Sequence, residues 1–333
     1  MHDTVSFDLE QNRLLIIDQT RLPGELKILS LHTIEEMEAA IYTLQVRGAP
    51  AIGVAAAIGL AVLAREIEHD YENKLREYAD RLSATRPTAV NLAWALDRML
   101  AGPHDPESLA RQALAMWRED IETCRCIGEH GSALLCDGDR VLTHCNAGRL
   151  ATVRYGTALA PIYVAAEQGK RIHVYADETR PLLQGARLTA YELAEAGIPV
   201  TLLCDNMAAS LLSTGAIKAI FVGTDRVARN GDAANKIGSL GLSILARNYN
   251  VPFYVCTPFS TVDFDCDHGG RIPIEQRAPE EVTQAWYTNR MAPADIEVYN
   301  PAFDIIPNEN IAAFVTECGV LSARDLSKVS ACV

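Results

Sequence analysis

The stretch that decides the fold is DRVLTHCNAG, residues 139–148, in which a short apolar run ends abruptly in polar residues. Arg140 to Thr143 has the length and the apolar, β-branched content of a buried strand. From residue 139 onward, similar runs alternate with segments of helical periodicity. Such alternation is typical of repeated strand and helix units, so we predict an α/β fold with a parallel sheet in this part of the chain.

The predicted elements follow one another in a regular order. The expected strands are Arg140 to Thr143, His173 to Ala176, Val200 to Cys204, Ala219 to Val222 and Phe253 to Cys256. The expected helices lie near residues 152–168, 186–196, 207–213 and 235–248. Right-handed crossovers would then form a Rossmann-like domain with helices on both faces of the sheet. Neither a GxGxxG motif after the first strand nor a P-loop is present, so we expect no nucleotide, no other cofactor and no metal.

The first part of the chain is predicted to be mostly helical. It opens with a β-hairpin of Val5 to Leu9 and Leu14 to Ile17. Thr33 and Glu36 have the spacing of a capping box, and Pro50 falls in the first turn of an Ala-rich helix. Further helices are expected near residues 72–83, 88–101 and 106–135. We therefore predict two domains, a mostly helical one over residues 1–137 and a Rossmann-like catalytic one over residues 138–333.

The composition favours a globular protein that binds a small molecule. Lys and Arg number 30 against 43 Asp and Glu, and the net charge of -13 disfavours nucleic acid and anionic membranes as partners. The uncharged run over residues 48–64 is short and rich in Ala and Gly, which predicts a buried helix rather than a membrane span. Because the nine cysteines are scattered and no secretory signal is evident, we expect reduced thiols and a cytoplasmic protein.

Polar residues directly follow four of the predicted strands. His144, Cys145 and Asn146 follow the first strand, and Asp177-Glu178-Thr179-Arg180 follows the second. Asp205 comes after the third strand, and Thr224 with Asp225 after the fourth. The carboxyl ends of parallel strands meet at one edge of a doubly wound sheet, where ligands bind. We therefore expect a thiol and several carboxylates to converge on one crevice.

Simpler interpretations of these residues stay open from the sequence alone. Cys145 could be a buried thiol that packs as a small hydrophobe. A Cys145–His144 hydrolase dyad is disfavoured, because neighbours in an extended segment point to opposite faces. Asp225 could be a helix N-cap or a partner of Arg226, and Asp205 is interpreted as a plain helix cap.

Three places combine a cation or amide side chain with a predicted helix N-terminus, which is a common phosphate site. The first is Arg47-Gly48-Ala49 before the Ala-rich helix, and the second is Arg86 before Pro87 and Thr88. The third is Asn235-Lys236, at the predicted start of a late helix. Each of these alone could instead be a solvated surface charge. The phosphate-site interpretation rests on the occurrence of all three in one chain.

Longer motifs carry a resemblance to a known family. They are RGAPAIGVAAA from Arg47, TRPTAVNL from Thr85, THCNAG from Thr143, DETRPLLQGARLTA from Asp177, VGTDRVARNGDAANKIG from Val222, IPIEQR from Ile272 and NPAFD from Asn300. With these motifs the chain resembles the methylthioribose-1-phosphate isomerases. Their wider family includes ribose-1,5-bisphosphate isomerase and the regulatory subunits of translation initiation factor 2B. The motifs extend over nearly the whole chain.

The resemblance implies roles for particular residues. Cys145 and Asp225 would be the catalytic pair. The residues that would hold the phosphate and hydroxyls of the substrate are Arg47, Gly48, Ala49, Arg86, Gln184, Asn235 and Lys236. The resemblance also implies a homodimer and a cofactor-free isomerisation of S-methyl-5-thioribose 1-phosphate to S-methyl-5-thioribulose 1-phosphate in methionine salvage.

The implied chemistry starts from a sugar whose anomeric phosphate blocks spontaneous ring opening. We expect Asp225, kept protonated by burial, to donate a proton to the ring oxygen while Cys145 assists at C1 and C2. A hydride shift and a phosphoenolate route both remain open. So do two other substrates, 5-deoxyribose 1-phosphate and ribose 1,5-bisphosphate, and a non-catalytic regulatory role like that of the initiation-factor subunits.

Overall fold

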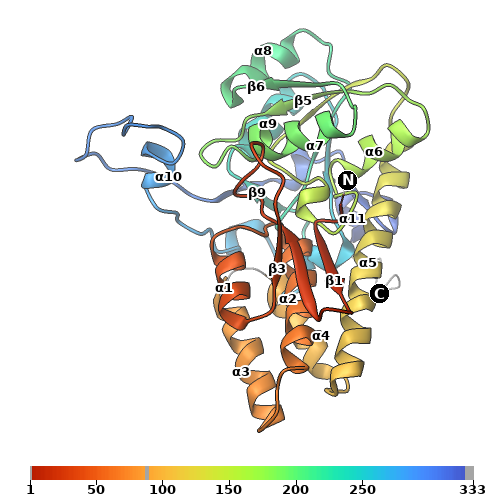
Figure 1. Cartoon of the computed structure of the whole chain (residues 1–333). Helices are drawn as coiled ribbons and strands as arrows, with labels where there is room; N and C mark the ends of the chain where they lie inside the picture. Colours follow the sequence, from red (N-terminus) through yellow and green to blue (C-terminus); the bar gives the residue numbers. More distant parts are fainter. Residues whose placement is uncertain (1, 87–89, 327–333) are drawn as a thin grey trace. The chain divides into compact units, whose positions relative to one another are not determined.

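The structure of the protein is a computed structural model, which describes residues 2–86 and 90–326 (Figure 1). The chain divides into two compact units. The first comprises Met1–Arg125 and Ala147–Gly156, and the second comprises Cys126–Asn146 and Thr157–Val333. The predicted boundary between residues 137 and 138 is therefore wrong, because the division falls earlier and a later segment returns to the first unit.

The displaced boundary has a physical cause in helix α5, Pro106–Ser132. The apolar residues of α5 keep a helical spacing throughout, so periodicity does not show where the chain changes units. Hydrogen bonds fix the returning segment. The Thr4 amide donates to the Val153 carbonyl at 3.1 Å, and the Gln19 side chain donates to the Leu150 carbonyl at 2.7 Å. Contacts between residues so far apart in sequence leave no local pattern.

The first unit begins with a small antiparallel sheet. Its strands are β1 (Val5–Asp8), β2 (Arg13–Ile17) and β3 (Ile28–Leu31), in the order β1-β2-β3. The predicted hairpin of β1 and β2 is confirmed. The third strand was not predicted, because its four residues, ILSL, are too few to show a clear alternation.

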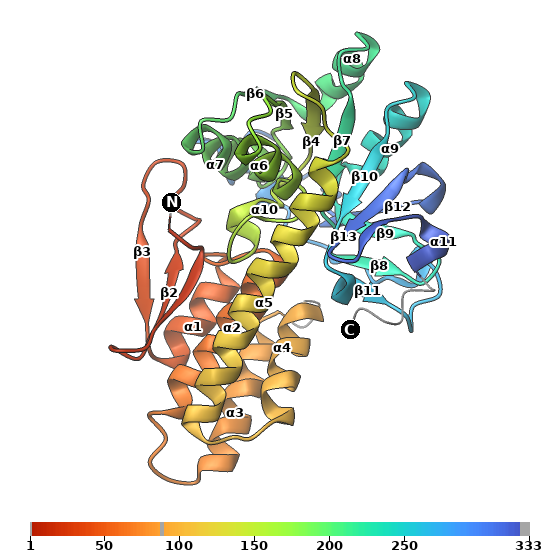
Figure 2. The same ribbon diagram turned by 90° about the vertical axis from the view of Figure 1, so that its right-hand side faces the viewer.

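Four helices make up most of the rest of the first unit, together with the first part of α5 (Figure 2). They are α1 (Ile34–Tyr42), α2 (Ala49–Ala64), α3 (Tyr71–Ala84) and α4 (Val90–Ala101). The capping box of Thr33 and Glu36 is confirmed at the start of α1. Every residue of α2 from Ala51 to Ala64 is buried, as expected for the Ala-rich helix. Among the described residues, no helix is both long enough and apolar enough to pass through a bilayer.

The second unit is built on a seven-stranded sheet. Its strands are β4 (Arg140–Thr143), β5 (His173–Asp177), β6 (Val200–Leu203), β7 (Ala219–Val222), β10 (Phe253–Cys256), β13 (Ala313–Thr316) and β14 (Gly319–Leu321). All five predicted strands are confirmed to within one residue. Phe221, Phe253 and Phe314 form part of its core, and each is at most 1% exposed.

The order of the strands defines where a ligand would bind. The sheet runs β14-β13-β10-β7-β4-β5-β6, and all neighbouring pairs are parallel except β13 with β14. From β4 the chain first proceeds to β5 and β6, and then crosses to the other side of β4 to form β7. The reversal of strand order therefore lies between β4 and β7, the place where doubly wound sheets bind their ligands.

The helices of the second unit are shorter than the sequence predicts. They are α6 (Ala160–Glu167), α7 (Ala190–Glu195), α8 (Ala208–Ser213) and α9 (Ser239–Asn248). Figure 2 shows α6 and α7 on one side of β4 and β7, and α9 on the other. The predicted helix over residues 152–168 begins only at Ala160. The one predicted over residues 186–196 starts with a π-helical turn, Gly185–Thr189, which continues into α7.

A second, four-stranded sheet in this unit was not predicted. Its strands are β8 (Arg226–Ala228), β9 (Ala233–Lys236), β11 (Val262–Asp263) and β12 (Phe303–Ile306), in the order β11-β8-β9-β12. Strands of two to four residues are too short for a clear alternation. Asn235 and Lys236 therefore lie in a strand, and the helix predicted to begin at Asn235 begins at Ser239 instead.

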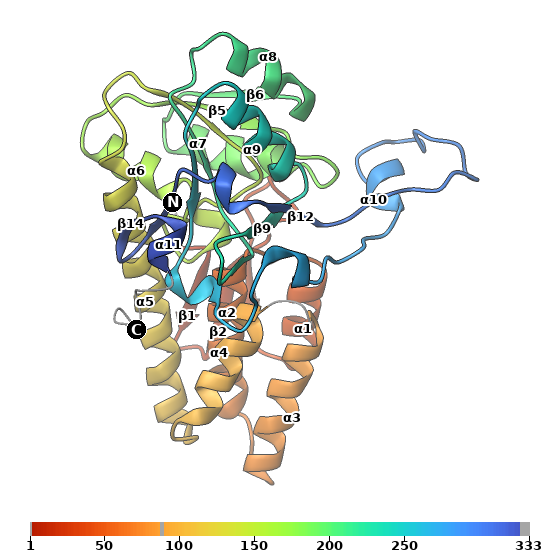
Figure 3. The same ribbon diagram turned by 180° about the vertical axis from the view of Figure 1, so that it is seen from behind.

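The remaining elements are short. They are the helices α10 (Glu280–Thr283) and α11 (Ala323–Leu326) and the single 3₁₀ turns Arg149–Ala151, Asp205–Met207, Phe259–Thr261, Gly269–Arg271 and Asn308–Asn310. Figure 3 shows α10 within a long loop that projects from the second unit.

Candidate active site

Three consecutive residues at the carboxyl end of β4 form the centre of the candidate site. His144 and Asn146 are buried, and Cys145 between them is half-buried. Each of the three is held by side chains from the end of β5 or from the segments that follow it. The end of β4 is therefore fixed mainly by residues that follow its neighbour β5 or end it.

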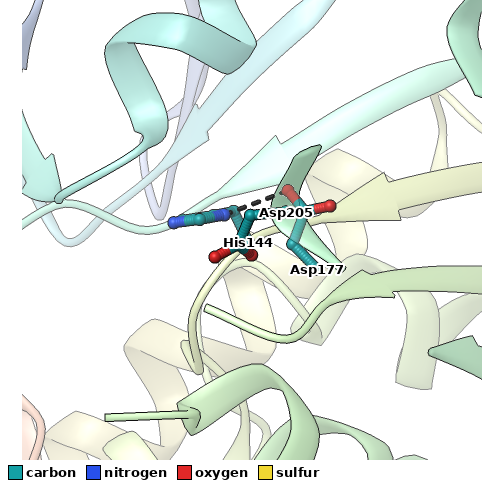
Figure 4. Close-up of side chains that lie close together, drawn as sticks. All are labelled: His144, Asp177 and Asp205. Atoms are coloured by element: carbon teal, nitrogen blue, oxygen red, sulfur yellow. Dashed lines mark hydrogen bonds and ion pairs between the residues drawn. The ribbon is translucent and has the colours of Figure 1, made fainter. Parts of the chain in front are cut away.

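His144 is held by hydrogen bonds at both ring nitrogens, and Figure 4 shows the one to Asp177. Nδ1 lies 3.0 Å from Oδ2 of Asp177, and Nε2 lies 2.9 Å from the carbonyl oxygen of Ile237. A carbonyl only accepts hydrogen bonds, so Nε2 must carry a proton. A second proton must lie between Nδ1 and the carboxylate. Because both nitrogens are engaged, the ring cannot take a proton from the adjacent thiol, which agrees with the argument against a hydrolase dyad.

The electrostatics of the His144–Asp177 pair favour keeping that second proton. Burial disfavours the imidazolium, but the Asp177 carboxylate outweighs it and raises the pKa of His144. Burial also raises the pKa of Asp177, against the opposing effect of His144. Removing the shared proton would leave a net negative charge in a buried place, which is strongly unfavourable. The pair therefore acts as a neutral, structural unit near neutral pH.

Gly238 makes room for the histidine ring. Its φ is +105°, and a Cβ on it would lie 2.8 Å from Cε1 and 3.0 Å from Nε2 of His144. Both the backbone conformation and the close approach therefore require glycine. The ring in turn bonds the carbonyl next to Gly238, so β4 is joined to the segment between β9 and α9.

Asp205 has a different role from the one predicted. Its two carboxylate oxygens accept hydrogen bonds from the amides of Thr179 and Arg180, each at 2.7 Å. It makes no side-chain cap at the 3₁₀ turn that it begins. The helix-cap interpretation is therefore wrong. An acidic residue before a helix resembles a cap in sequence, but here it fixes the loop that follows β5.

His144, Asp177 and Asp205 bring one possible metal-ligand atom each to within 4.8 Å of one another. Both ring nitrogens of His144 and both carboxylate oxygens of Asp205 already have partners. Oδ1 of Asp177 is buried and has no partner among the described residues. A cation could bind His144 only by breaking one of its two contacts, so the cluster fits a hydrogen-bonded anchor better than a metal site.

Cys145 adopts a left-handed backbone conformation, with φ of +67°. Its amide donates to Oγ1 of Thr179 at 2.8 Å, and its carbonyl accepts from Oγ1 of Thr189 at 2.7 Å. Both backbone groups are thus satisfied by side chains instead of by the sheet. The conformation takes Cys145 out of the alternation of β4, so the simple strand geometry used for the sequence prediction does not apply to its side chain.

Asn146 is anchored in the second unit as firmly as His144. Its Nδ2 donates to Oγ1 of Thr189 at 3.1 Å and also to Glu192. The other carboxylate oxygen of Glu192 accepts from the Tyr163 hydroxyl at 2.9 Å. Because Asn146 and Glu192 are both buried, this network fixes the chain directly after Cys145.

Asp225 follows β7, the strand that pairs with β4. Its amide donates to the carbonyl of Ala234 at 2.9 Å, which places its backbone beside β9 and Asn235. The residue is exposed, so the burial expected from the sequence is wrong for this structure. A strand and not a helix follows it, and Arg226 pairs with Asp263 at 3.4 Å. The N-cap interpretation of Asp225 is thereby excluded.

Gln184 is buried, with 6% of its surface exposed, and its Oε1 has no hydrogen-bond partner among the described residues. It directly precedes the π-helical turn that carries Thr189. The next residue, Gly185, packs so closely that a Cβ would lie 1.7 Å from the carbonyl oxygen of Asp177. An unsatisfied buried amide oxygen is unfavourable, so this atom is well suited to accept a hydrogen bond from a ligand hydroxyl.

Asn235 and Lys236 lie in β9, where they have partners of their own. Asn235 is buried and donates to Oγ of Ser239 at 2.8 Å. The ammonium of Lys236 donates to the carbonyl of Ala302 at 3.0 Å. One part of the predicted phosphate site is wrong, namely that the amides at the start of the following helix are available to a phosphate. The amides of Gly238 and Leu240 at the start of α9 already donate to the Asp304 carboxylate.

The remaining predicted site residues belong to the first unit. Gly48 precedes α2 with φ of +90°, and a Cβ on it would lie 2.3 Å from the Ala151 carbonyl oxygen. The first turn of α2 has no side-chain cap, which suits anion binding by Ala49 and its neighbours. Arg47 and Arg86 are both half-buried. Pro87 and Thr88, part of the second predicted phosphate site, lie outside the described residues.

The structure thus gathers five of the nine predicted site residues in the second unit, and the other four lie in the first. Thr179 and Thr189 make the contacts that define the conformation of Cys145. Thr179 was among the polar residues expected after the second strand, but no role was predicted for it. Thr189 lies inside a helical segment and left no comparable signal.

The strand order and these residues define a class of protein. It is a Rossmann-like α/β protein with a thiol and a carboxylate at the ends of neighbouring central strands. The sequence model described as the Initiation factor 2 subunit family matches residues 45–323. The chain therefore belongs to the initiation factor 2 subunit family.

Individual relatives agree with the narrower resemblance. A methylthioribose-1-phosphate isomerase of Parabacteroides distasonis is 54% identical over 327 residues, which cover 94% of this chain and 98% of the relative. A 5-deoxyribose 1-phosphate isomerase of Moorella thermoacetica is 52% identical and covers 92% and 91%. The crystal structure of 5-methylthioribose 1-phosphate isomerase from Pyrococcus horikoshii has a TM-score of 0.92 at 39% identity, covering 98% and 95%. The predicted family resemblance and fold class are confirmed.

Proposed function

We propose that this chain is an aldose–ketose isomerase that converts S-methyl-5-thioribose 1-phosphate into S-methyl-5-thioribulose 1-phosphate, a reaction of methionine salvage. The observation that carries the proposal is the placement of Cys145 and Asp225 after the two paired strands on either side of the switch point. The relatives named for this reaction share about half of the sequence over nearly the whole chain. The reaction involves no net oxidation or reduction of the substrate, so it needs no redox cofactor.

In the proposed mechanism, Asp225 is the general acid that opens the sugar ring. It donates a proton to the ring oxygen as the bond from that oxygen to C1 breaks. Because Asp225 is exposed, we propose that bound substrate covers it and favours the neutral carboxyl by excluding water. The C2 hydroxyl loses a proton as C2 becomes a carbonyl, which balances the proton delivered to the ring oxygen. Cys145 assists charge and proton movement at C1 and C2.

The substrate's phosphate and hydroxyls are proposed to be held by the residues that the family resemblance implies, namely Arg47, Gly48, Ala49, Arg86, Gln184, Asn235 and Lys236. Two features support this assignment. Gln184 has a buried acceptor with no partner, and the first turn of α2 has no side-chain cap. The Lys236 ammonium lies 4.5 Å from the centre of the ring of Phe303, its partner on β12, which restricts its position.

The experiment that tests the function is a turnover assay of the purified protein with three sugar phosphates. We expect the highest kcat/KM for the methylthio substrate, a lower value for 5-deoxyribose 1-phosphate, and the lowest for ribose 1,5-bisphosphate. The second substrate is included because one relative carries that name. No turnover of any of the three would overturn the proposal in favour of a regulatory role.

The route of hydrogen transfer is tested by running the reaction in heavy water. A direct hydride shift from C2 to C1 leaves the product without solvent deuterium. A phosphoenolate intermediate that exchanges with solvent would place deuterium at C1. Mass spectrometry of the product distinguishes the two.

Two further parts of the proposal concern the cellular setting. We propose a cytoplasmic location, because a working thiol at Cys145 needs a reducing compartment. We also propose a homodimer, the assembly that the resemblance implies. Exposed apolar side chains in the loop after α10, among them Trp286, Met291 and Tyr299, are compatible with such an assembly. Light scattering after size-exclusion chromatography should give a mass near twice 36.3 kDa, and a monomer mass would contradict it.

A further inference from the structure

The backbone of Cys145 is held in an unfavourable conformation by two threonine side chains. A left-handed conformation of a residue other than glycine is uncommon, and it is often found where function requires it. At Cys145 both backbone groups point at hydroxyls, since Thr179 accepts from its amide and Thr189 donates to its carbonyl. We call these two residues the threonine clamp.

Both hydroxyls of the clamp are fully engaged. Oγ1 of Thr179 accepts from Cys145 and donates to the carbonyl of Asp177 at 3.0 Å. Oγ1 of Thr189 donates to Cys145 and accepts from Nδ2 of Asn146. Both threonines are completely buried, so water cannot replace the hydroxyls without a rearrangement.

The backbone of the loop that carries Thr179 is also strained, and it is held by hydrogen bonds of its own. Thr179 has φ of +65°, a conformation that is a genuine outlier for a β-branched residue. Asp205 holds it there through the amides of Thr179 and Arg180. The Asp205 carboxylate thus supports the strained backbone of Thr179 directly, and that of Cys145 only through the Thr179 hydroxyl. Such an arrangement persists only where the surrounding contacts determine it.

The residues on either side of Cys145 are fixed independently of the clamp's contacts with Cys145. His144 is held by Asp177 and the Ile237 carbonyl, and Asn146 is held by Glu192. Loss of one clamp hydroxyl should therefore change the conformation of Cys145 itself, while its neighbours keep most of their contacts. This makes the effect of the clamp measurable at a single residue.

We propose that Thr179 and Thr189 are positioning residues of the isomerase reaction, whose hydroxyls hold Cys145 in the left-handed conformation that directs its thiol at the substrate. This inference rests on the proposed function for its kinetic consequence. Its structural consequence, the altered reactivity of the Cys145 thiol, can be measured without any substrate.

The test compares Thr179→Val and Thr189→Val with the conservative Thr179→Ser and Thr189→Ser. Valine keeps the shape of threonine but leaves the Cys145 amide or carbonyl without its partner, whereas serine keeps the hydroxyl. We expect each valine variant to lower kcat at least about tenfold while KM changes by less than about threefold, the pattern of a contact that serves the chemical step. Each serine variant should recover most of the rate.

A second readout follows alkylation of Cys145 by iodoacetamide, measured by mass spectrometry of its peptide, with the exposed Cys136 as the internal reference. A thiol that has moved reacts at a different rate. We expect the rate at Cys145 to change at least about threefold in each valine variant and to stay near that of the wild type in each serine variant. The rate at Cys136 should be constant throughout.

Thr316→Val is the matched control. Thr316 is also completely buried, and its hydroxyl also accepts from an amide, that of Cys318, and donates to a carbonyl, that of Gly319, both at 3.1 Å. This variant should lose stability like the others while kcat and the alkylation of Cys145 stay unchanged.

Unchanged kcat and an unchanged rate of Cys145 alkylation in folded valine variants would overturn the proposal that the threonine clamp positions Cys145. So would an equal loss of kcat in Thr316→Val. If Thr179→Val does not fold, the result for Thr189→Val decides. If the wild type turns over none of the three sugar phosphates, the proposed function fails, and the alkylation rates alone decide on the clamp.

Discussion

Two positions of the molecule share a left-handed backbone and reach it by different means. Gly48, before α2 in the first unit, has φ of +90°, and Cys145, after β4 in the second unit, has φ of +67°. Glycine adopts this region without steric cost. Cysteine does not, and its amide and carbonyl are each held by a threonine hydroxyl. A positive φ is thus intrinsic to the residue in one place and imposed by neighbours in the other.

The difference reflects what each place offers to a ligand. At Gly48 the absence of a side chain lets the chain pass close to Ala151, and no side chain caps the first turn of α2. Such main-chain amides suit binding of an anion. At Cys145 a particular side chain is needed, so surrounding residues must supply the constraint. The comparison predicts that substitutions around Gly48 act mainly on substrate binding and on stability. Substitutions around Cys145 should act mainly on kcat.

The largest effect is expected at Asp225, the proposed general acid. It follows β7, the strand that pairs with β4. Asp225→Asn removes the proton that the sugar ring oxygen needs, so kcat should fall by about a thousandfold, within the range of general acid catalysis. KM should change little, which steady-state kinetics measures. The exposed Asp265 gives a matched control, because Asp265→Asn also removes one negative charge and should keep the wild-type rate. A near wild-type rate for Asp225→Asn would exclude it as the acid.

The next effect concerns Gly48 itself. In Gly48→Ala the new Cβ would lie 2.3 Å from the Ala151 carbonyl oxygen, in addition to the strain of a positive φ. In Gly138→Ala, at φ of +86°, nothing lies within 4 Å of the new Cβ. The control should therefore lose only about 1–2 kcal/mol of unfolding free energy, and Gly48→Ala clearly more. Chemical denaturation measures both, and equal losses would contradict the close approach.

A smaller effect is expected for Arg47, next to Gly48. Arg47→Ala removes a cation proposed to bind phosphate, so KM should rise by about ten- to a hundredfold, the value of one charge-assisted contact. kcat at saturating substrate should stay within a few-fold of the wild type. Arg118→Ala, which removes an exposed arginine of α5, is the control and should leave both constants unchanged. If KM is unchanged in Arg47→Ala, the proposed role of this residue is wrong.

The last prediction concerns the pH dependence of the stability of the first unit. Burial raises the pKa of Asp120 to about 7, and its carboxylate accepts the Val153 amide at 2.7 Å. The folded state thus binds this proton more tightly than the unfolded state. The contribution to stability is complete below about pH 4 and is lost as the pH rises from about 4 to about 7.

Asp120→Asn keeps an acceptor for the Val153 amide but has no proton to lose. The unfolding free energy of the variant should therefore fall less than that of the wild type between about pH 4 and about pH 7. Urea denaturation at a series of pH values measures this difference. The exposed Asp97 of α4 provides the control, and Asp97→Asn should follow the wild-type profile. Parallel profiles for Asp120→Asn and the wild type would contradict the raised pKa.

Much of the second unit could be predicted because its strands are continuous apolar runs. Three of the five predicted strands match the observed bounds, and β5 and β6 differ by one residue at one end. The four strands of the small sheet could not be predicted in this way. They are two to four residues long, and β9 contains Asn235 and Lys236, which have no strand pattern.

The candidate site was predictable where a residue follows a strand, and less so elsewhere. Cys145 and Asp225 were placed correctly after β4 and β7. The burial of Asp225 was wrong, because exposure depends on segments that pack around a strand end and not on the strand itself. Asp205 was misjudged for a related reason. Its partners are amides of the loop after β5, a different strand.

By itself the sequence determined the order of strands and helices in the second unit, the capping of α1, the buried α2 and the residues after each strand. These follow from periodicity and local propensity, which act over a few neighbouring residues. Only the tertiary structure decided where the units divide, how Thr179 and Thr189 hold Cys145, and why Gly48 and Gly185 must be glycine. Each of these depends on a close contact between segments distant in sequence, and such contacts exist only once the chain has folded.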